Sequence, residues 1–99
     1  MSLLDNVKAS VRIRDSVPPT PAEKQRSVDI QGFINACKDD IRRVGVDEGL
    51  ITDSNVRVEN ACKLFVKAAL DYQGKGSEYK ERYESYLSAM ALDVDYKEA

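Results

Sequence analysis

The sequence predicts an all-α fold, a small bundle of about four helices followed by a polar C-terminal tail. First, apolar residues recur at alternating steps of four and three in two long stretches, which places them on one face of a helix. Second, residue types that begin or end helices flank these stretches, with Thr20 before one and Gly45 after it. Third, 99 residues with 42% hydrophobic content suit a single domain spanning residues 1–99.

A short first helix is expected from Ser2, whose hydroxyl can accept hydrogen bonds from the N–H groups of the first turn. Its inner face is marked by three apolar residues: Leu4, Val7 and Val11. Lys8 and Arg12 lie one turn apart on this helix. Solvent is the simpler expectation for this basic face, and contact with an acidic partner or a phosphate backbone is the alternative.

A long second helix is predicted over residues 21–44. Two prolines break the segment before it, Thr20 can cap its first turn, and Glu23 can reach back to complete a capping box. Its apolar stripe consists of Ile30, Ile34, Cys37, Ile41 and Val44. Gly45 suits the left-handed residue that ends many helices. Gly32, in the middle of the helix, allows either a close helix contact or a bend.

A connecting loop over residues 46–52 should place Leu50 and Ile51 beneath the helices. The third helix, over residues 58–72, is predicted to be central because it is apolar over most of its circumference. Its main stripe consists of Val58, Cys62, Phe65, Ala69 and Tyr72. Several polar residues over 52–55 could cap it, so its first residue is open within about two positions.

A fourth, tyrosine-rich helix is predicted to be capped by Ser77, after a Gly-Lys-Gly break. Its stripe consists of Tyr79, Tyr83, Tyr86, Leu87 and Met90. These rings either pack on the central helix with their hydroxyls reaching water, or form an exposed contact patch, since tyrosine is enriched in interfaces. Residues 93–99 form a polar, acidic tail, which we expect to be mobile in the free protein.

The composition argues against several classes of protein. A formal net charge of −2, with both signs mixed along the chain, does not suit a dedicated nucleic-acid binder, which needs a concentrated basic face. No run of 18 apolar residues predicts a membrane-spanning helix, and the N-terminus shows no signal-peptide pattern. We therefore expect the two cysteines to stay reduced in a cytosol.

No enzymatic activity, metal site or cofactor site is expected. The chain has no histidine, so no hydroxyl or thiol nucleophile can be paired with an imidazole base. Cys37 and Cys62 form no C-x-x-C pair and each lies on an apolar stripe, so both are expected to be inert core residues. The adjacent carboxylates at 39–40 and 47–48 have no sequence reason to be buried, and we interpret them as surface groups.

Three segments, taken in order, carry a family resemblance: V-D-I-Q-G-F-I-N-A-C-K-D-D-I at 28–41, K-L-F-V-K-A-A-L-D-Y at 63–72, and S-E-Y-K-E-R-Y-E-S-Y-L-S-A-M-A-L at 77–92, followed by Asp95 and Tyr96. Together they resemble the small helical head-tail connector (adaptor) proteins of tailed bacteriophages and prophages, most closely the Gram-positive branch. The similarity covers about residues 3–96. The order of the three segments, rather than any one of them, carries the resemblance.

The resemblance implies a structural virion protein without catalytic residues or cofactors. Such connectors form a homo-oligomeric ring, typically of twelve subunits, beneath the portal protein at the neck between head and tail. The ring extends the DNA channel and docks the stopper or tail-completion proteins. DNA passes through without sequence-specific binding, no membrane is involved, and assembly takes place in the host cytoplasm.

Two segments are candidate contacts with the portal or a neighbouring subunit. The tail is one, because it is polar and has no core role; its candidate residues are Asp93, Val94, Asp95, Tyr96 and Lys97. The loop over 46–53 is the other, because Gly49 adjoins the apolar pair Leu50 and Ile51. If both of these residues are buried within one subunit, a contact between neighbours through them is excluded.

The alternative function is a small helical regulatory module that binds a protein partner or nucleic acid. Its nucleic-acid version requires five basic residues to converge on one face: Lys8, Arg12, Arg14, Arg42 and Arg43.

Overall fold

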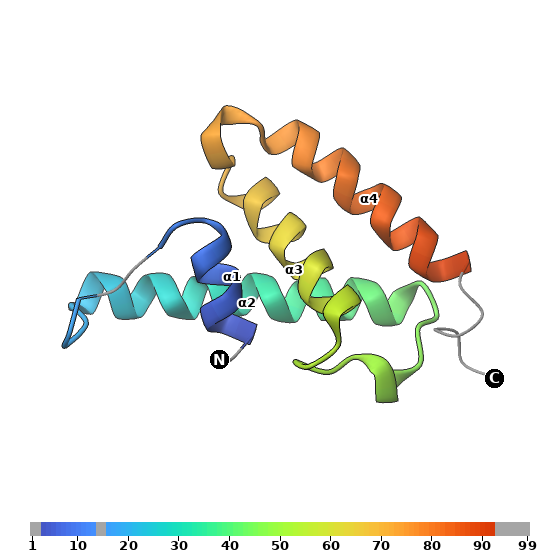
Figure 1. The fold of residues 1–99 in the computed structure, drawn as a ribbon, viewed down its shortest axis with the longest axis horizontal. Helices are drawn as coiled ribbons and strands as arrows, with labels where there is room; N and C mark the ends of the chain where they lie inside the picture. The colour runs from blue at the N-terminus through green and yellow to red at the C-terminus, as the bar shows by residue number, and fades with distance from the viewer. Residues whose placement is uncertain (1–2, 14–15, 93–99) are drawn as a thin grey trace.

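The computed structural model describes residues 3–13 and 16–92, which form four α-helices (Figure 1). The helices are α1 (Leu3–Ser10), α2 (Pro21–Arg43), α3 (Val56–Ala69) and α4 (Gly76–Leu92). Two short 3-10 turns, η1 (Glu48–Leu50) and η2 (Tyr72–Gly74), connect α2 to α3 and α3 to α4. Neither described range contains a strand, so the predicted all-α fold of about four helices is confirmed.

Helix α3 is the centre of the arrangement, as the sequence predicts. It packs against α2, against α4 and against α1, which also lies on α2 (Figure 1). The first turns of α2 extend beyond the other helices at one end of an elongated molecule that measures 45 × 28 × 17 Å. The chain therefore folds around α3, with α2 and α4 diverging on either side of it in this view.

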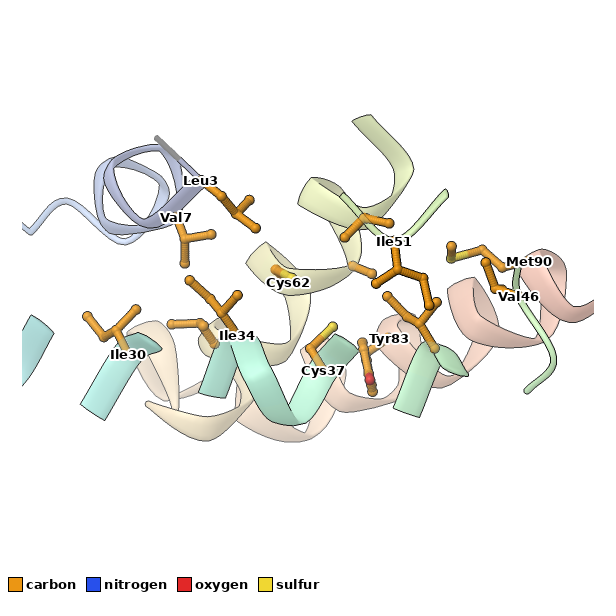
Figure 2. Close-up of a cluster of buried hydrophobic side chains, with 14 of the residues drawn as sticks. Leu3, Val7, Ile30, Ile34, Cys37, Val46, Ile51, Cys62, Tyr83 and Met90 are labelled. Carbon is orange, nitrogen blue, oxygen red and sulfur yellow. The ribbon is translucent and has the colours of Figure 1, made fainter. Parts of the chain in front are cut away.

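The core follows the apolar stripes of α1, α2 and α3 (Figure 2). Its largest fully buried side chains are Ile30, Ile34, Ile41, Met90, Val7, Val58, Val66, Cys37 and Cys62. Both cysteines are free thiols facing each other's helix in this core, as expected of structural cysteines. Tyr83 of α4 is also buried, and its ring lies edge-on to Phe65, with 5.2 Å between the centroids.

The start of α2 is built from the predicted capping box. The Thr20 hydroxyl accepts from the Glu23 N–H at 3.2 Å, and the Glu23 carboxylate accepts from the Thr20 N–H at 3.0 Å. The same carboxylate also accepts from the Ser16 N–H at 2.6 Å. At the other end, Gly45 adopts φ 95°, the left-handed conformation predicted for it.

Gly32 neither bends α2 nor meets another helix of the subunit. The helix continues without a break through this position, and a Cβ built on Gly32 would meet nothing within 4 Å. Neither of the two interpretations of this glycine therefore holds within one chain.

The connection between α3 and α4 differs from the prediction. Helix α3 ends at Ala69, because Asp71 adopts the left-handed conformation with φ 49°. The Asp71 carboxylate accepts from the Gly76 N–H at 2.8 Å, so α4 begins at Gly76 and Ser77 lies inside it. The prediction that Ser77 caps α4 is wrong, because a carboxylate five residues earlier satisfies the first N–H of the helix.

Lys8 does not lie on a solvated face. Its side chain lies between α1 and α2 with the residue only 8% exposed, and its ammonium donates to the Ser27 hydroxyl at 2.9 Å. The methylenes of lysine can cover apolar surface while the ammonium reaches a polar partner. Both interpretations of Lys8, as a solvated group or as a contact for a partner, are therefore wrong.

Candidate functional site

The predicted contact loop lies partly inside the subunit. Ile51 is 8% exposed and belongs to the core, and Leu50 is partly buried against that core (Figure 2). Because Ile51 is buried within its own chain, it has no surface for a neighbour, and the candidate contact narrows to Leu50. The residues from Asp93 to Lys97 lie outside the described part of the chain.

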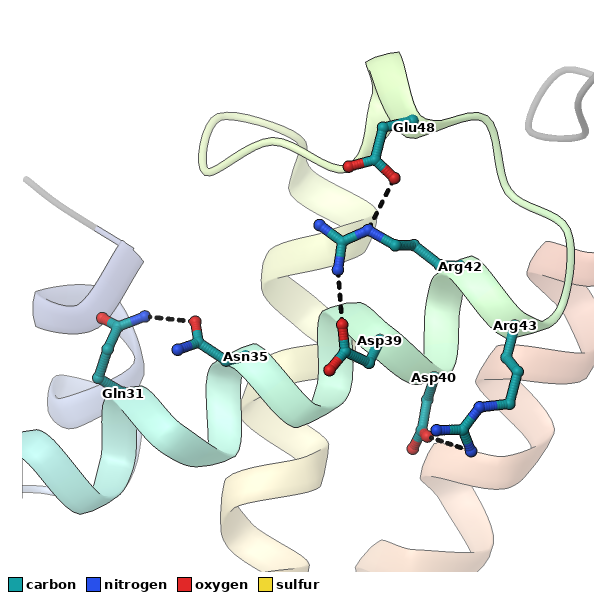
Figure 3. Close-up of polar contacts among 7 residues, drawn as sticks. All are labelled: Gln31, Asn35, Asp39, Asp40, Arg42, Arg43 and Glu48. Atoms are coloured by element: carbon teal, nitrogen blue, oxygen red, sulfur yellow. Dashed lines mark hydrogen bonds and ion pairs between the residues drawn. The ribbon is translucent and has the colours of Figure 1, made fainter.

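Ion pairs of Arg42 attach the outer side of this loop to α2. The Arg42 guanidinium donates to Glu48 at 2.7 Å and to Asp39 at 2.7 Å, which joins η1 to the last turns of α2 (Figure 3). These two carboxylates raise the pKa of Arg42, with the hydrogen bond to Glu48 as the main cause. All three groups are exposed, so these ion pairs add little to the folding stability. Their role is to hold η1 against the end of α2.

The basic residues that the nucleic-acid alternative requires do not converge on one face in the described part of the chain. Lys8 is bound at Ser27, fifteen residues before Arg42, which is about 22 Å along a helix with a rise of 1.5 Å per residue. Arg42 is paired with two carboxylates, and Arg43 lies 3.4 Å from Asp40 (Figure 3). Arg14 lies outside the described residues. The condition set for a nucleic-acid-binding module is therefore not met.

The two cysteines and Tyr83 are buried in the core. The adjacent Cys37 thiol and burial raise the pKa of Cys62, and burial raises the pKa of Tyr83. The Tyr83 hydroxyl donates to Asp40 at 2.9 Å. Burial and the neighbouring thiol thus favour the protonated form of Cys62, which is a poor nucleophile. These three side chains bring α2, α3 and α4 together in the core.

The described tyrosines of α4 pack against the fold and form no exposed patch, although the Tyr83 hydroxyl reaches Asp40 rather than water. Tyr83 packs in the core, whereas Tyr72 and Tyr79 are half-buried at the junction of α3 and α4. There the Lys67 ammonium lies 5.8 Å from the Tyr72 ring centroid and 5.4 Å from that of Tyr79, and the Arg82 guanidinium also lies over Tyr79. These cation–aromatic contacts brace the junction from the outside.

An apolar groove of about 620 Å³ lies between α3 and α4, and we call it the α3–α4 groove. Phe65, Ala68 and Ala69 of α3 form one side, and Tyr83 and Leu87 of α4 form the other. Its rim is charged and consists of Asp40, Asp71, Lys80 and Glu84. An apolar surface with a polar rim is typical of a site that receives another protein segment.

A second unusual surface is the segment over residues 16–29, which we call the arm. No side chain in it is buried, although it includes the first nine residues of α2. Val17 is 99% exposed and Val28 is 64% exposed. Helices in small domains are usually stabilised by burying an apolar face, and this part of α2 does not do so in its own subunit.

Neither a metal centre nor a membrane span is found in the part of the chain that the structure describes. Among those residues, no three acidic or cysteine side chains gather where they could hold a metal ion. No helix within residues 3–13 or 16–92 is both long and apolar enough to cross a bilayer.

Comparison with known proteins identifies no relative: no family model, no curated protein and no solved structure matches this chain.

The sequence analysis predicted neither the groove nor the arm. The arm had a signal, because only Val17 and Val28 are large apolar residues between 16 and 29. No sequence pattern indicated the groove, because Ala69 has the helical spacing of a core residue and yet is exposed.

Proposed function

We propose that the protein is a structural head-tail connector of a tailed bacteriophage or prophage. In this role, copies form a ring, dodecameric in the family it resembles, beneath the portal protein. The ring extends the DNA channel and presents a docking surface for the stopper or tail proteins. It has no catalytic activity and no cofactor, and it acts in the neck of the virion after assembly in the host cytoplasm.

The observation that carries this proposal is the ordered resemblance of three segments. Residues 28–41 lie in α2, residues 63–72 cover the second half of α3 and the turn after it, and residues 77–92 lie in α4. They are thus the helices that pack on one another through α3, so the resemblance concerns the body of the fold rather than its connections.

The distribution of charge suits a channel wall that DNA passes without sticking. Arg42 and Arg43 at the end of α2 are matched by nearby carboxylates, and Lys63 is paired with Glu59 at 3.2 Å. Basic residues paired with carboxylates release fewer phosphate counterions than a bare basic face. A dense lysine and arginine ring facing the lumen would contradict this part of the proposal.

The proposed portal contact is the acidic tail over residues 93–99. Deleting it should leave the helical circular dichroism spectrum unchanged, because every buried residue of the described core lies before it. Binding to the portal protein of the same genome, measured by co-sedimentation, should fall. The full-length Leu50→Ser variant tests the remaining candidate contact in the loop separately.

Portal binding that is unchanged after the deletion would remove the tail from the proposed interface. Genes for portal, capsid and tail proteins beside the gene of this protein would favour the connector over a regulatory binding module. Their absence, together with a single bound partner helix in solution, would favour the module.

A further inference from the structure

We propose that copies of this protein join head to tail, with the arm of one subunit seated in the α3–α4 groove of the next. The inference rests on the proposed ring and names the two surfaces that form its repeated contact. Both surfaces lie on every subunit and neither satisfies the other within one chain, because α2 continues unbroken from the arm into the core.

The groove is suited to a segment that approaches closely. Ala68 and Ala69 leave its α3 side without long side chains, and Phe65 and Leu87 offer apolar surface on either side. Helix axes approach to about 8–10 Å, and the side chains at the contact decide the distance. Small residues flanked by larger apolar ones therefore favour a helix or a tight loop as occupant.

The arm is a pre-shaped projection. From Pro21 to Ile30, the first core residue of α2, nine residues span about 14 Å at 1.5 Å per residue. The Glu23 carboxylate ties the N–H groups of Ser16 and Thr20 together, which holds Val17 at the tip in solvent. A segment already ordered in its bound shape loses little conformational entropy when it binds.

One pair of opposite charges can meet across the contact. On the groove rim, the Asp71 carboxylate accepts from the Gly76 N–H and Asp40 faces Arg43, whereas Glu84 is an exposed carboxylate. On the arm, Glu23 faces Arg26 at 4.0 Å and Asp29 accepts from Gln25, whereas Lys24 is an exposed ammonium. Opposite charges around an apolar contact select the orientation in which the arm enters.

This geometry leads to a ring. The contact joins two different surfaces, so each subunit uses its arm once and its groove once. Repetition of such a contact closes a ring when the rotation per subunit divides a full turn, and gives an open filament otherwise. A second copy of the chain is thus the occupant that the proposed ring requires, and its arm is a segment that the groove can receive.

The test uses one variant of each surface, in the full-length protein without portal. Val17→Asp places a charge at the tip of the arm, and Ala69→Trp fills the groove; both residues are exposed, so the fold should persist. The matched controls are Val56→Asp and Ser88→Trp, at exposed positions outside both surfaces. Sedimentation at millimolar concentration measures assembly, and circular dichroism checks folding.

We expect the wild type and both controls to form species larger than dimers. Each surface variant should raise the concentration needed for assembly by about tenfold or more, the loss of roughly 1.4 kcal/mol of binding free energy. A mixture of the two variants should form dimers and nothing larger, because one intact arm and one intact groove remain. Lys24→Glu should weaken assembly, and Glu84→Lys in the same chain should restore it.

A wild type that stays monomeric, or assembly that neither surface variant weakens, would overturn the inference. The proposed function has a separate readout, since wild-type binding to the portal does not depend on which surfaces join neighbours. Portal binding without the predicted variant effects would leave the connector function and remove the arm–groove contact. Assembly that responds to the variants as predicted, in a protein that does not bind the portal, would support the arm–groove contact and contradict the connector function.

Discussion

At the residue scale, Tyr83 connects α4 to α2. Its ring packs on Phe65 of α3, and its hydroxyl donates to Asp40 of α2. The pairing of this phenol with a carboxylate inside an otherwise apolar stripe explains why α4 carries a buried tyrosine where leucine would fill the space. A buried polar group with a partner specifies one arrangement of the helices, because other packings would leave it unsatisfied.

Tyr83→Phe should lower the free energy of unfolding by about 1 kcal/mol, since it removes one partly buried hydrogen bond and keeps the ring. Urea denaturation measures this change. The control is Tyr86→Phe on the same helix, which should change stability by less than about 0.5 kcal/mol. Equal losses in both variants would show that the hydroxyl of Tyr83 does not anchor α4.

Glu23 gives the arm a dependence on pH. Hydrogen bonds from the N–H groups of Thr20 and Ser16 lower the pKa of Glu23 from 4.5 to about 2 in the folded protein. Because the folded pKa lies below the unfolded one, the carboxylate stabilises the fold fully above pH 4.5. This contribution decreases as the pH falls from 4.5 towards 2.

The measurement is the difference in unfolding free energy between the wild type and Glu23→Gln as a function of pH. The difference should be constant at neutral pH and should narrow below about pH 4.5, where Glu23 begins to be protonated in the unfolded wild type but not yet in the folded one. Ser16 and Thr20 keep their N–H groups in both proteins, which isolates the charge. A difference that does not change down to pH 2 would contradict the assignment.

At the element scale, two helical glycines have opposite roles. Gly32 has open space around it, so it weakens α2 without a packing reason in the subunit. Gly76 begins α4 where a Cβ would lie 2.6 Å from the Asp71 carboxylate and 3.1 Å from the Ala68 carbonyl oxygen. A side chain at position 76 would therefore displace the carboxylate that satisfies the first N–H of α4.

Gly32→Ala should raise the free energy of unfolding by about 1 kcal/mol, the difference in helix propensity between these residues. Gly76→Ala should lower it, because the Asp71 turn must open to make room. Thermal unfolding of both variants shows whether the melting temperature rises for Gly32→Ala and falls for Gly76→Ala. Destabilisation by Gly32→Ala would mean that α2 has a close neighbour at this position.

The ends of a helix could be predicted from the sequence where the residues that determine them lie close together in the chain. Thr20, Pro21 and Glu23 lie within four residues, and the start of α2 was predicted at the correct residue. The end of α3 was not, because an aspartate in the left-handed conformation is stable only with its partner at Gly76. Contacts of this kind depend on tertiary structure and leave no periodic signal.

Which face of a helix is buried depends on how many neighbours it has. On α3, Val58 and Cys62 are buried as predicted, but Ala69 is exposed, since the helices around α3 diverge at that end. The divergence leaves the groove open, so the candidate contact surface arises where the periodic pattern predicts core. In the loop, the burial of Ile51 confirms that this residue lies beneath the helices and excludes it as a contact for a neighbour.

At the scale of the whole molecule, the chain is a small domain with an apolar groove on one side and a projecting arm at one end. A domain of this size buries a modest core, so its stability is marginal by itself. Association that occurs only in the folded state adds to that stability by mass action. A ring in which every arm is seated would therefore stabilise each subunit as well as build the channel.

The most direct test of the connector function is to mix the purified protein with the portal protein of its own genome and examine the complex by electron microscopy. We predict an additional ring on one end of the portal, with the symmetry of the portal or a fixed relation to it. A folded protein and an intact portal that form no such ring, in the presence of a DNA-filled head as well as without one, would contradict the proposed function.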